Sequence, residues 1–146
     1  YGLALAQQHH ITPSYAIYEP GFIRLGAALH RAYPGAPTPI YRFMFSQHIA
    51  FGFPPKDWAL DAYLRLLELE QPGAAWMVAG LGVELDELMG YAVARGGHVR
   101  VGLEDAPMGC PHDNLTLLRQ ARQRIEAAGS TLATAAQVRE RLQQTN

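Results

Sequence analysis

The fold is decided by residues 96–105, Gly96-Gly97-His98-Val99-Arg100-Val101-Gly102-Leu103-Glu104-Asp105. Strand side chains alternate between two faces, so this stretch predicts one short strand with an apolar face and a polar face. The two faces would hold Val99, Val101 and Leu103 on one side and His98, Arg100, Gly102 and Glu104 on the other. A polar inner face is typical of a barrel strand that packs outward on helices and points inward at a site.

The end of this predicted strand carries two adjacent carboxylates, Glu104 and Asp105. In barrels of this kind the chemistry lies at the C-terminal ends of the strands. Neighbouring side chains there diverge, so one carboxylate can bind a metal while the other acts as a base. Arg100, on the same face as Glu104, can hold a carboxylate of a substrate or of Asp105. The alternative is an interior ion pair without a catalytic role.

Composition places the 146 residues among soluble, globular chains, with 49% apolar and 17% charged residues, enough for one domain with a sizeable core. The net charge of −1 gives no electrostatic reason to expect nucleic acid or an anionic membrane as a partner. The single cysteine, Cys110, and the lack of a long apolar run predict a cytoplasmic location. Because the chain starts in mid-pattern at Tyr1, we expect it to be part of something longer.

Strands and helices alternate along the whole chain. Predicted strands begin near residues 14, 40, 75 and 98, and predicted helices cover 1–9, 22–33, 56–70, 84–95, 115–128 and 134–143. This alternation predicts a parallel sheet with right-handed crossovers. A small doubly wound sheet and half of a (β/α)8 barrel both fit, since a full barrel has roughly 250 residues. The polar inner face of the fourth strand favours the half-barrel.

Other residues give weaker signals. The turn Gly80-Leu81-Gly82 follows the third predicted strand, where glycines can let a phosphate approach backbone amides, although a simple tight turn explains them better. His98 lies at the start of its strand, the end usually devoted to stability, and is predicted to be structural. His48, just after the second strand, could line a pocket or be solvated.

The run from Gly96 to Asp105 resembles the most specific signature of the beta-keto acid cleavage enzymes. Four further segments are similar to that family: Tyr18 to Phe22, Trp76 to Gly82, Asn114, and Leu132 to Leu142. The resemblance covers nearly all of residues 1–146, which we interpret as a single domain. It extends only over the C-terminal half of the family's barrel.

The resemblance implies a zinc-dependent (β/α)8 enzyme, usually oligomeric, that condenses a beta-keto acid with acetyl-CoA into acetoacetate and a new CoA thioester. Zinc would polarise the oxygens of the keto acid as a Lewis acid. By position, Glu104 would be the carboxylate zinc ligand and Asp105 part of the base machinery. Arg100 would orient Asp105 and help hold the anionic substrate. The family's His-x-His zinc ligands are not in this sequence, so we expect the remaining ligands on an N-terminal half-barrel outside this chain.

Two other interpretations stay open. The chain could be a non-catalytic half-barrel that serves as a scaffold or assembly element, in which case no His-x-His strand would precede Tyr1. It could also be a small flavodoxin-like domain that binds an anion at the Gly80–Gly82 turn, which predicts a compact monomer without a metal near Glu104.

Overall fold

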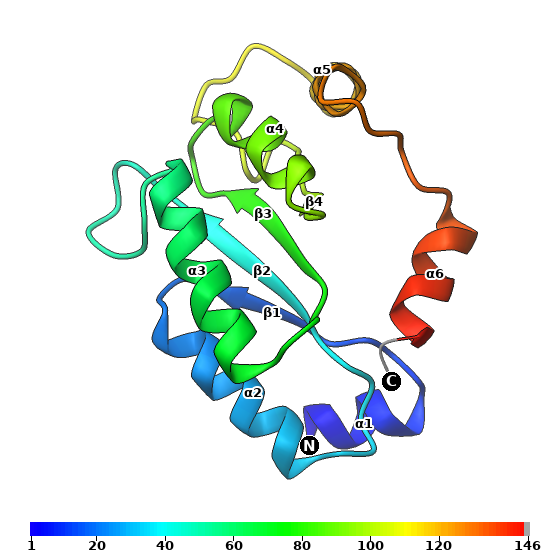
Figure 1. The fold of residues 1–146 in the computed structure, drawn as a ribbon. Coiled ribbons are helices and arrows are strands. Elements are labelled where there is room, and N and C mark those ends of the chain that lie inside the picture. Colours follow the sequence, from blue (N-terminus) through cyan, green and yellow to red (C-terminus); the bar gives the residue numbers. More distant parts are fainter. Residues whose placement is uncertain (145–146) are drawn as a thin grey trace.

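A computed structural model describes residues 1–144 and contains one four-stranded parallel sheet (Figure 1). The strands lie in the order β1-β2-β3-β4, each beside the strand that precedes it in sequence. Their bounds are β1 Ser14–Ile17, β2 Ile40–Phe45, β3 Trp76–Gly80 and β4 His98–Val99. A flavodoxin-like sheet would place its first strand between the second and the third. That interpretation is therefore wrong, and the sequential order is that of a barrel.

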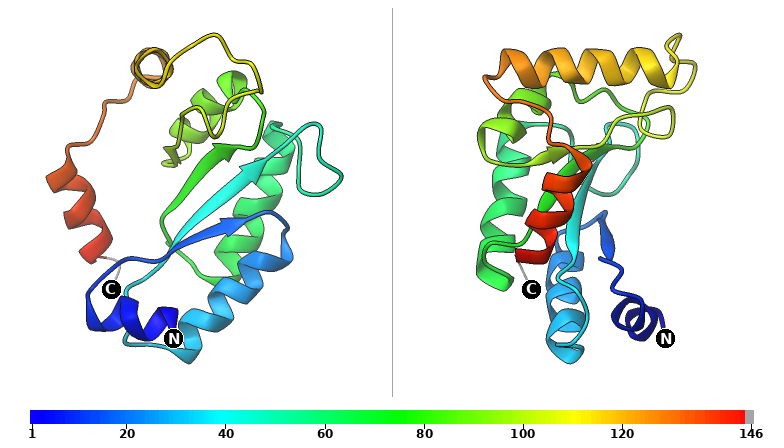
Figure 2. Two further views of the ribbon diagram at one scale, coloured as in Figure 1. Left: turned by 180° about the vertical axis from the view of Figure 1, so that it is seen from behind. Right: turned by 90° about the vertical axis from the view of Figure 1, so that its right-hand side faces the viewer.

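Three helices cover one face of the sheet and leave the other face open. Figure 2 shows α2, α3 and α4 on the same side of the strands, with the uncovered face visible from behind. The helices are α1 Gly2–Gln8, α2 Gly21–Ala32, α3 Asp57–Glu70, α4 Asp86–Ala94, α5 Asn114–Ala127 and α6 Ala135–Gln144. One-sided helices on a sequential parallel sheet make half of a (β/α)8 barrel, as predicted. No helix within residues 1–144 combines the length and the apolar character needed to cross a bilayer.

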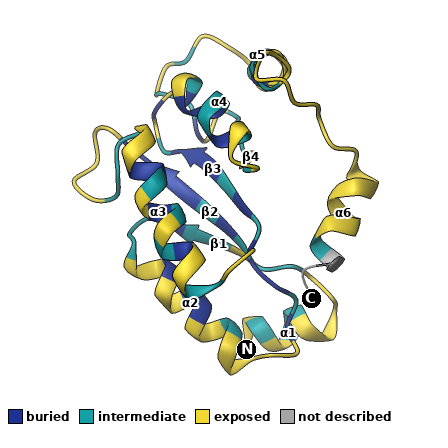
Figure 3. Cartoon of the chain, viewed as in Figure 1, coloured by how far each residue is buried: buried dark blue, intermediate teal, exposed yellow. Residues whose placement is uncertain are grey.

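The hydrophobic core lies between the sheet and these helices. The odd-numbered residues of β2 point toward the helices, and Tyr41 and Phe43 are completely buried there. Helix α3 turns Leu60, Tyr63 and Leu67 to the sheet, at the spacing of one helical face. The ring of Phe43 stacks on that of Tyr63, with their centroids 4.8 Å apart. Figure 3 shows this buried layer, in contrast to the exposed helix α6.

The strand predicted over residues 98–105 is much shorter than expected. Val99 and Val101 pack against the core, as predicted, but Leu103 is 55% exposed, so its assignment to the apolar face is wrong. The chain leaves the strand direction at Gly102, whose carbonyl accepts hydrogen bonds from the N–H groups of Asp105 and Ala106, each at 3.0 Å. The two carboxylates therefore stand on a turn after β4 rather than on the strand.

Candidate active site at the carboxyl end of the sheet

A partly buried ion pair between Arg100 and Asp105 forms the centre of the candidate site. The Nε and Nη2 atoms of Arg100 both donate to Oδ1 of Asp105, at 2.9 and 2.6 Å. The Asp105 side chain is only 9% exposed and that of Arg100 24% exposed. Two donors on one carboxylate fix the orientation of Asp105 in a partly dry environment. The sequence prediction that Arg100 holds Asp105 agrees with this geometry.

The backbone around Asp105 is fixed by β3 and by α5. The carbonyl of Asp105 accepts a hydrogen bond from the N–H of Val83 at 3.1 Å. A Cβ on Gly80 would lie 2.8 Å from that carbonyl oxygen, so the close approach of the turn to β3 requires glycine there. On the other side, Asn114 at the start of α5 accepts from the N–H of Leu103 at 2.9 Å. These contacts hold the turn in a single position.

Burial raises the pKa of the Asp105 carboxyl above its ordinary value of 3.8. The hydrogen bonds and the charge of Arg100 oppose this effect without cancelling it, and the Arg42 charge also lowers the pKa while Glu104 raises it. A carboxyl with a raised pKa is better matched to exchanging protons near neutral pH. The environment of Asp105 thus favours the protonated carboxyl more than water does.

Glu104 differs sharply from its neighbour. Its side chain is 78% exposed, and its ion pair is a loose contact of 3.5 Å between Oε2 and Nη1 of Arg100. It lines an open cavity of about 970 Å³ formed by the loops after β2, β3 and β4, together with His48 and Cys110. The two adjacent carboxylates thus have separate environments, one buried and paired, the other open to a ligand.

Glu104 suits a metal ligand, but the described residues do not complete a metal site. Within residues 1–144, no three His, Cys, Asp or Glu side chains lie close enough together to hold an ion. Catalytic zinc usually has three protein ligands. Glu104 therefore fits as one carboxylate ligand of a site whose other ligands would come from elsewhere.

The Gly80–Gly82 turn has a structural explanation of its own. The N–H groups of Leu81 and Val83 already donate to the carbonyls of Phe45 and Asp105. Gly82 is exposed and adopts a φ of +67°, which favours glycine. Phosphate binding at this turn stays a prediction.

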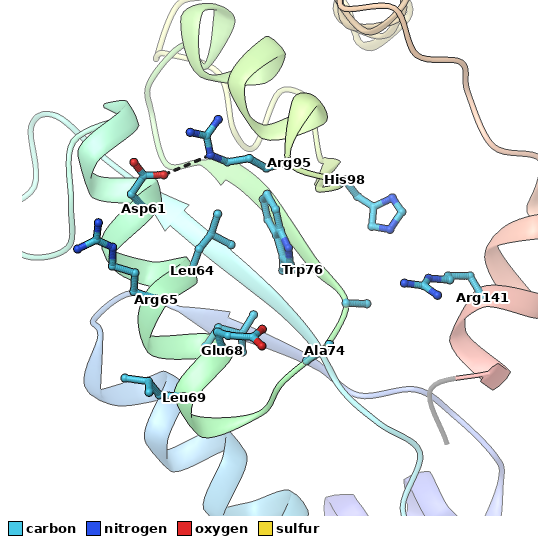
Figure 4. Close-up of a pocket in the computed structure, with 14 residues that line it drawn as sticks. Asp61, Leu64, Arg65, Glu68, Leu69, Ala74, Trp76, Arg95, His98 and Arg141 are labelled. Carbon is cyan, nitrogen blue, oxygen red and sulfur yellow. Dashed lines mark ion pairs between the residues drawn. The ribbon is translucent and has the colours of Figure 1, made fainter.

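His98 lies at the opposite end of the sheet from Glu104. It lines a cavity with Trp76, Arg95 and Arg141, as Figure 4 shows. The ion pair between Arg95 and Asp61, 3.3 Å long, lies beside this cavity. His98 is thus separated from Glu104 by the length of the sheet, and its structural role stays a prediction.

Sequence reasoning did not single out two polar side chains, one on β2 and one directly after it. Arg42 and Ser46 occupy even-numbered positions, on the open face of the sheet, opposite the buried Tyr41 and Phe43. A charge inside an otherwise apolar strand is the signal that could have identified Arg42. Ser46, directly after β2, is 8% exposed.

A half-barrel whose loops at the strand ends carry a buried Asp–Arg pair beside an open glutamate defines an α/β protein of the barrel-enzyme class. The family model described as beta-keto acid cleavage enzyme matches residues 1–143. The chain belongs to this family.

Proposed function

We propose that this protein is a zinc-dependent beta-keto acid cleavage enzyme that condenses a beta-keto acid with acetyl-CoA to give acetoacetate and a new CoA thioester. Family membership supports this class of activity. The observation that carries the proposal is the Asp105–Arg100 pair beside the open Glu104 carboxylate. We also propose that the protein is a cytoplasmic homo-oligomer whose site is completed by an N-terminal half-barrel.

Asp105 takes a proton from the keto acid in this proposal. Both hydrogen bonds from Arg100 end on Oδ1, so Oδ2 is left to receive the proton. Arg100 keeps the carboxylate oriented and stabilises it after the proton has left again. The raised pKa of Asp105 allows this residue to hold the proton until a later step returns it to the substrate.

Glu104 contributes one carboxylate ligand to the zinc ion in this proposal. Its loose contact with Arg100 restrains the carboxylate without occupying both oxygens. When bound, zinc supplies Lewis-acid polarisation of the substrate oxygens. The remaining ligands are expected outside the described residues.

Two substitutions in the full-length protein test these roles. Glu104→Gln is expected to lower zinc content and turnover together, because the amide is a poorer zinc ligand. Asp105→Asn is expected to retain zinc and to lower turnover by about 10²- to 10⁴-fold, the usual contribution of a general base. Zinc content is measured by elemental analysis, and turnover by thioester formation from a panel of beta-keto acids with acetyl-CoA.

The matched control is Glu68→Gln, which neutralises an exposed carboxylate on α3. Full activity in both site variants would show that the roles are assigned wrongly. A wild-type protein without zinc and without turnover on any keto acid would instead support the scaffold interpretation.

A further inference from the structure

Arg42 places a positive charge on the open face of the sheet. It lies in the middle of β2, in register with Ala16 on β1 and Met77 on β3. Neither a methyl group nor a thioether offers a good hydrogen-bond acceptor to a guanidinium. The nearest side chains of the sheet therefore do not neutralise Arg42.

The Nε atom of Arg42 has no hydrogen-bond partner among the residues that the structure describes. This Nε is buried, and no carboxylate lies within ion-pair distance of Arg42 among residues 1–144. The Oγ of Ser46, on the same face of β2, is also buried without a partner. A buried N–H without an acceptor is costly, so such groups normally have a partner in the functional state.

Arg100, the other cation on this face, is already committed. Its Nε and Nη2 atoms bind Asp105, and its Nη1 atom contacts Glu104. Arg42 has no ion pair among residues 1–144, so it is the cation that is available to a carboxylate on the open face.

Arg42 lies deeper in the half-barrel than the reacting groups. Gly80, which contacts Asp105, is in register with Phe45, three residues beyond Arg42 along β2. Three strand residues span about 10 Å. A keto acid that reacts beside Asp105 and extends along the open face toward the start of β2 would thus bring a group farther along its chain to Arg42.

We propose that Arg42 is a specificity-determining residue that binds a distal carboxylate, so that the preferred substrates are straight-chain beta-keto dicarboxylic acids. This inference rests on the proposed function and adds a substrate class to it. A monocarboxylic keto acid of the same length leaves Arg42 without a partner and is used less well.

The test compares matched acids on the full-length protein with zinc and acetyl-CoA. The probes are 3-oxo dicarboxylic acids of five to seven carbons, each paired with the 3-oxo monocarboxylic acid of equal length. For at least one pair, wild-type kcat/KM is expected to favour the diacid by about 10-fold or more, the worth of one hydrogen-bonded charge. Arg42→Gln is expected to remove this preference, and Arg42→Lys to restore part of it.

The matched control is Arg65→Gln, which removes one exposed positive charge from α3 and should keep the wild-type preference. A binding measurement tests the same point without turnover. Calorimetry is expected to show that hexanedioate binds the wild type at least about 10-fold more tightly than hexanoate, and that Arg42→Gln binds both alike.

Several results would overturn the inference. A wild type that uses monocarboxylic acids as well as diacids contradicts it while the proposed function stands. An equal loss on both acids in Arg42→Gln would mean that Arg42 binds the shared carboxylate or pairs with another protein segment. A wild type that turns over neither acid rejects the proposed function, and the inference with it.

Discussion

Asp105 is a carboxylate whose burial and whose counter-ion shift its pKa in opposite directions, and burial has the larger effect. The free energy of the ionised Asp105 carboxylate in the folded protein therefore depends strongly on a single side chain, Arg100, which is itself only 24% exposed. Breaking one partner of a buried ion pair leaves an uncompensated charge, which costs far more than losing an exposed pair. At the residue scale, Arg100 is thus a structural as well as a functional group.

We expect Arg100→Gln to lower the free energy of unfolding by about 2 kcal/mol at pH 7.5. The folded state of the variant raises the pKa of Asp105 further above its unfolded value, so it binds a proton more readily than the unfolded chain. Stability then falls as pH rises through the folded-state pKa and recovers below it. Urea unfolding at pH 7.5 and pH 5 should show a difference from wild type that narrows at the lower pH.

The control for this prediction is Arg122→Gln. The side chains of Arg122 and Glu126 in this ion pair are 62% and 47% exposed, so losing the pair should change the free energy of unfolding very little. The double variant Arg100→Gln/Asp105→Asn should regain part of the stability, because it no longer contains the unpaired negative charge of Asp105. A destabilisation of Arg100→Gln that is independent of pH would mean that packing, not charge, explains the effect.

The sequence predicted the residues of the Arg100 site because a period-two pattern and two adjacent carboxylates are visible without coordinates. It did not reveal that Asp105 is buried while Glu104 is open. That difference arises from Val83, Gly80 and Asn114, whose contacts with the turn connect residues distant in sequence. Arg42 is visible in the sequence as a charge inside an apolar strand, but the lack of a partner for its Nε atom is shown only by the structure.

At the scale of elements, the turn after β4 depends on how closely it approaches the end of β3. A Cβ added to Gly80 would lie 2.6 Å from the carbonyl oxygen of Val83 and 2.8 Å from that of Asp105. Both atoms are backbone and cannot rotate away. We expect Gly80→Ala to destabilise the protein by about 2 kcal/mol, as overpacking does, and to reduce turnover by displacing Asp105.

Gly90→Ala is the control for Gly80→Ala. Gly90 lies inside α4, and a Cβ there would meet nothing within 4 Å. Alanine should stabilise this helix by about 0.5–1 kcal/mol. Thermal unfolding and steady-state kinetics of both variants check the pair, and equal stability in the two would contradict the role given to Gly80.

The helices and strands were predicted close to their observed bounds, because apolar spacing and Gly or Pro breaks mark them in the sequence. The exception is β4, which ends at Val99 although the alternation continues to Leu103. Alternation indicates which residues could share a face. The length of a strand depends instead on the backbone hydrogen bonds that it makes with a neighbouring strand. Past Arg100, whose N–H donates to the carbonyl of Val78, the chain turns at Gly102 instead of continuing the ladder.

At the scale of the whole molecule, the sheet has two edge strands, β1 and β4, and one uncovered face. Exposed edges of a sheet present unpaired N–H and C=O groups and readily accept further strands. The polar groups of the candidate site lie on or above the same open face. Closure of the barrel around this face would therefore complete the sheet and enclose the site in one step.

Hydrogen exchange of the full-length protein tests this closure. In parallel ladders the N–H groups alternate in direction, and Ile40 donates to the carbonyl of Pro13 while Arg100 donates to that of Val78. The N–H groups of Ala16 and Val99 consequently point away from the sheet. We expect both to exchange as slowly as the N–H of Phe43 in central β2, because added strands accept their hydrogen bonds. Exchange of Ala16 and Val99 more than about 100-fold faster than Phe43 would mean that these edges stay open, and the site would then have to function on an unclosed sheet.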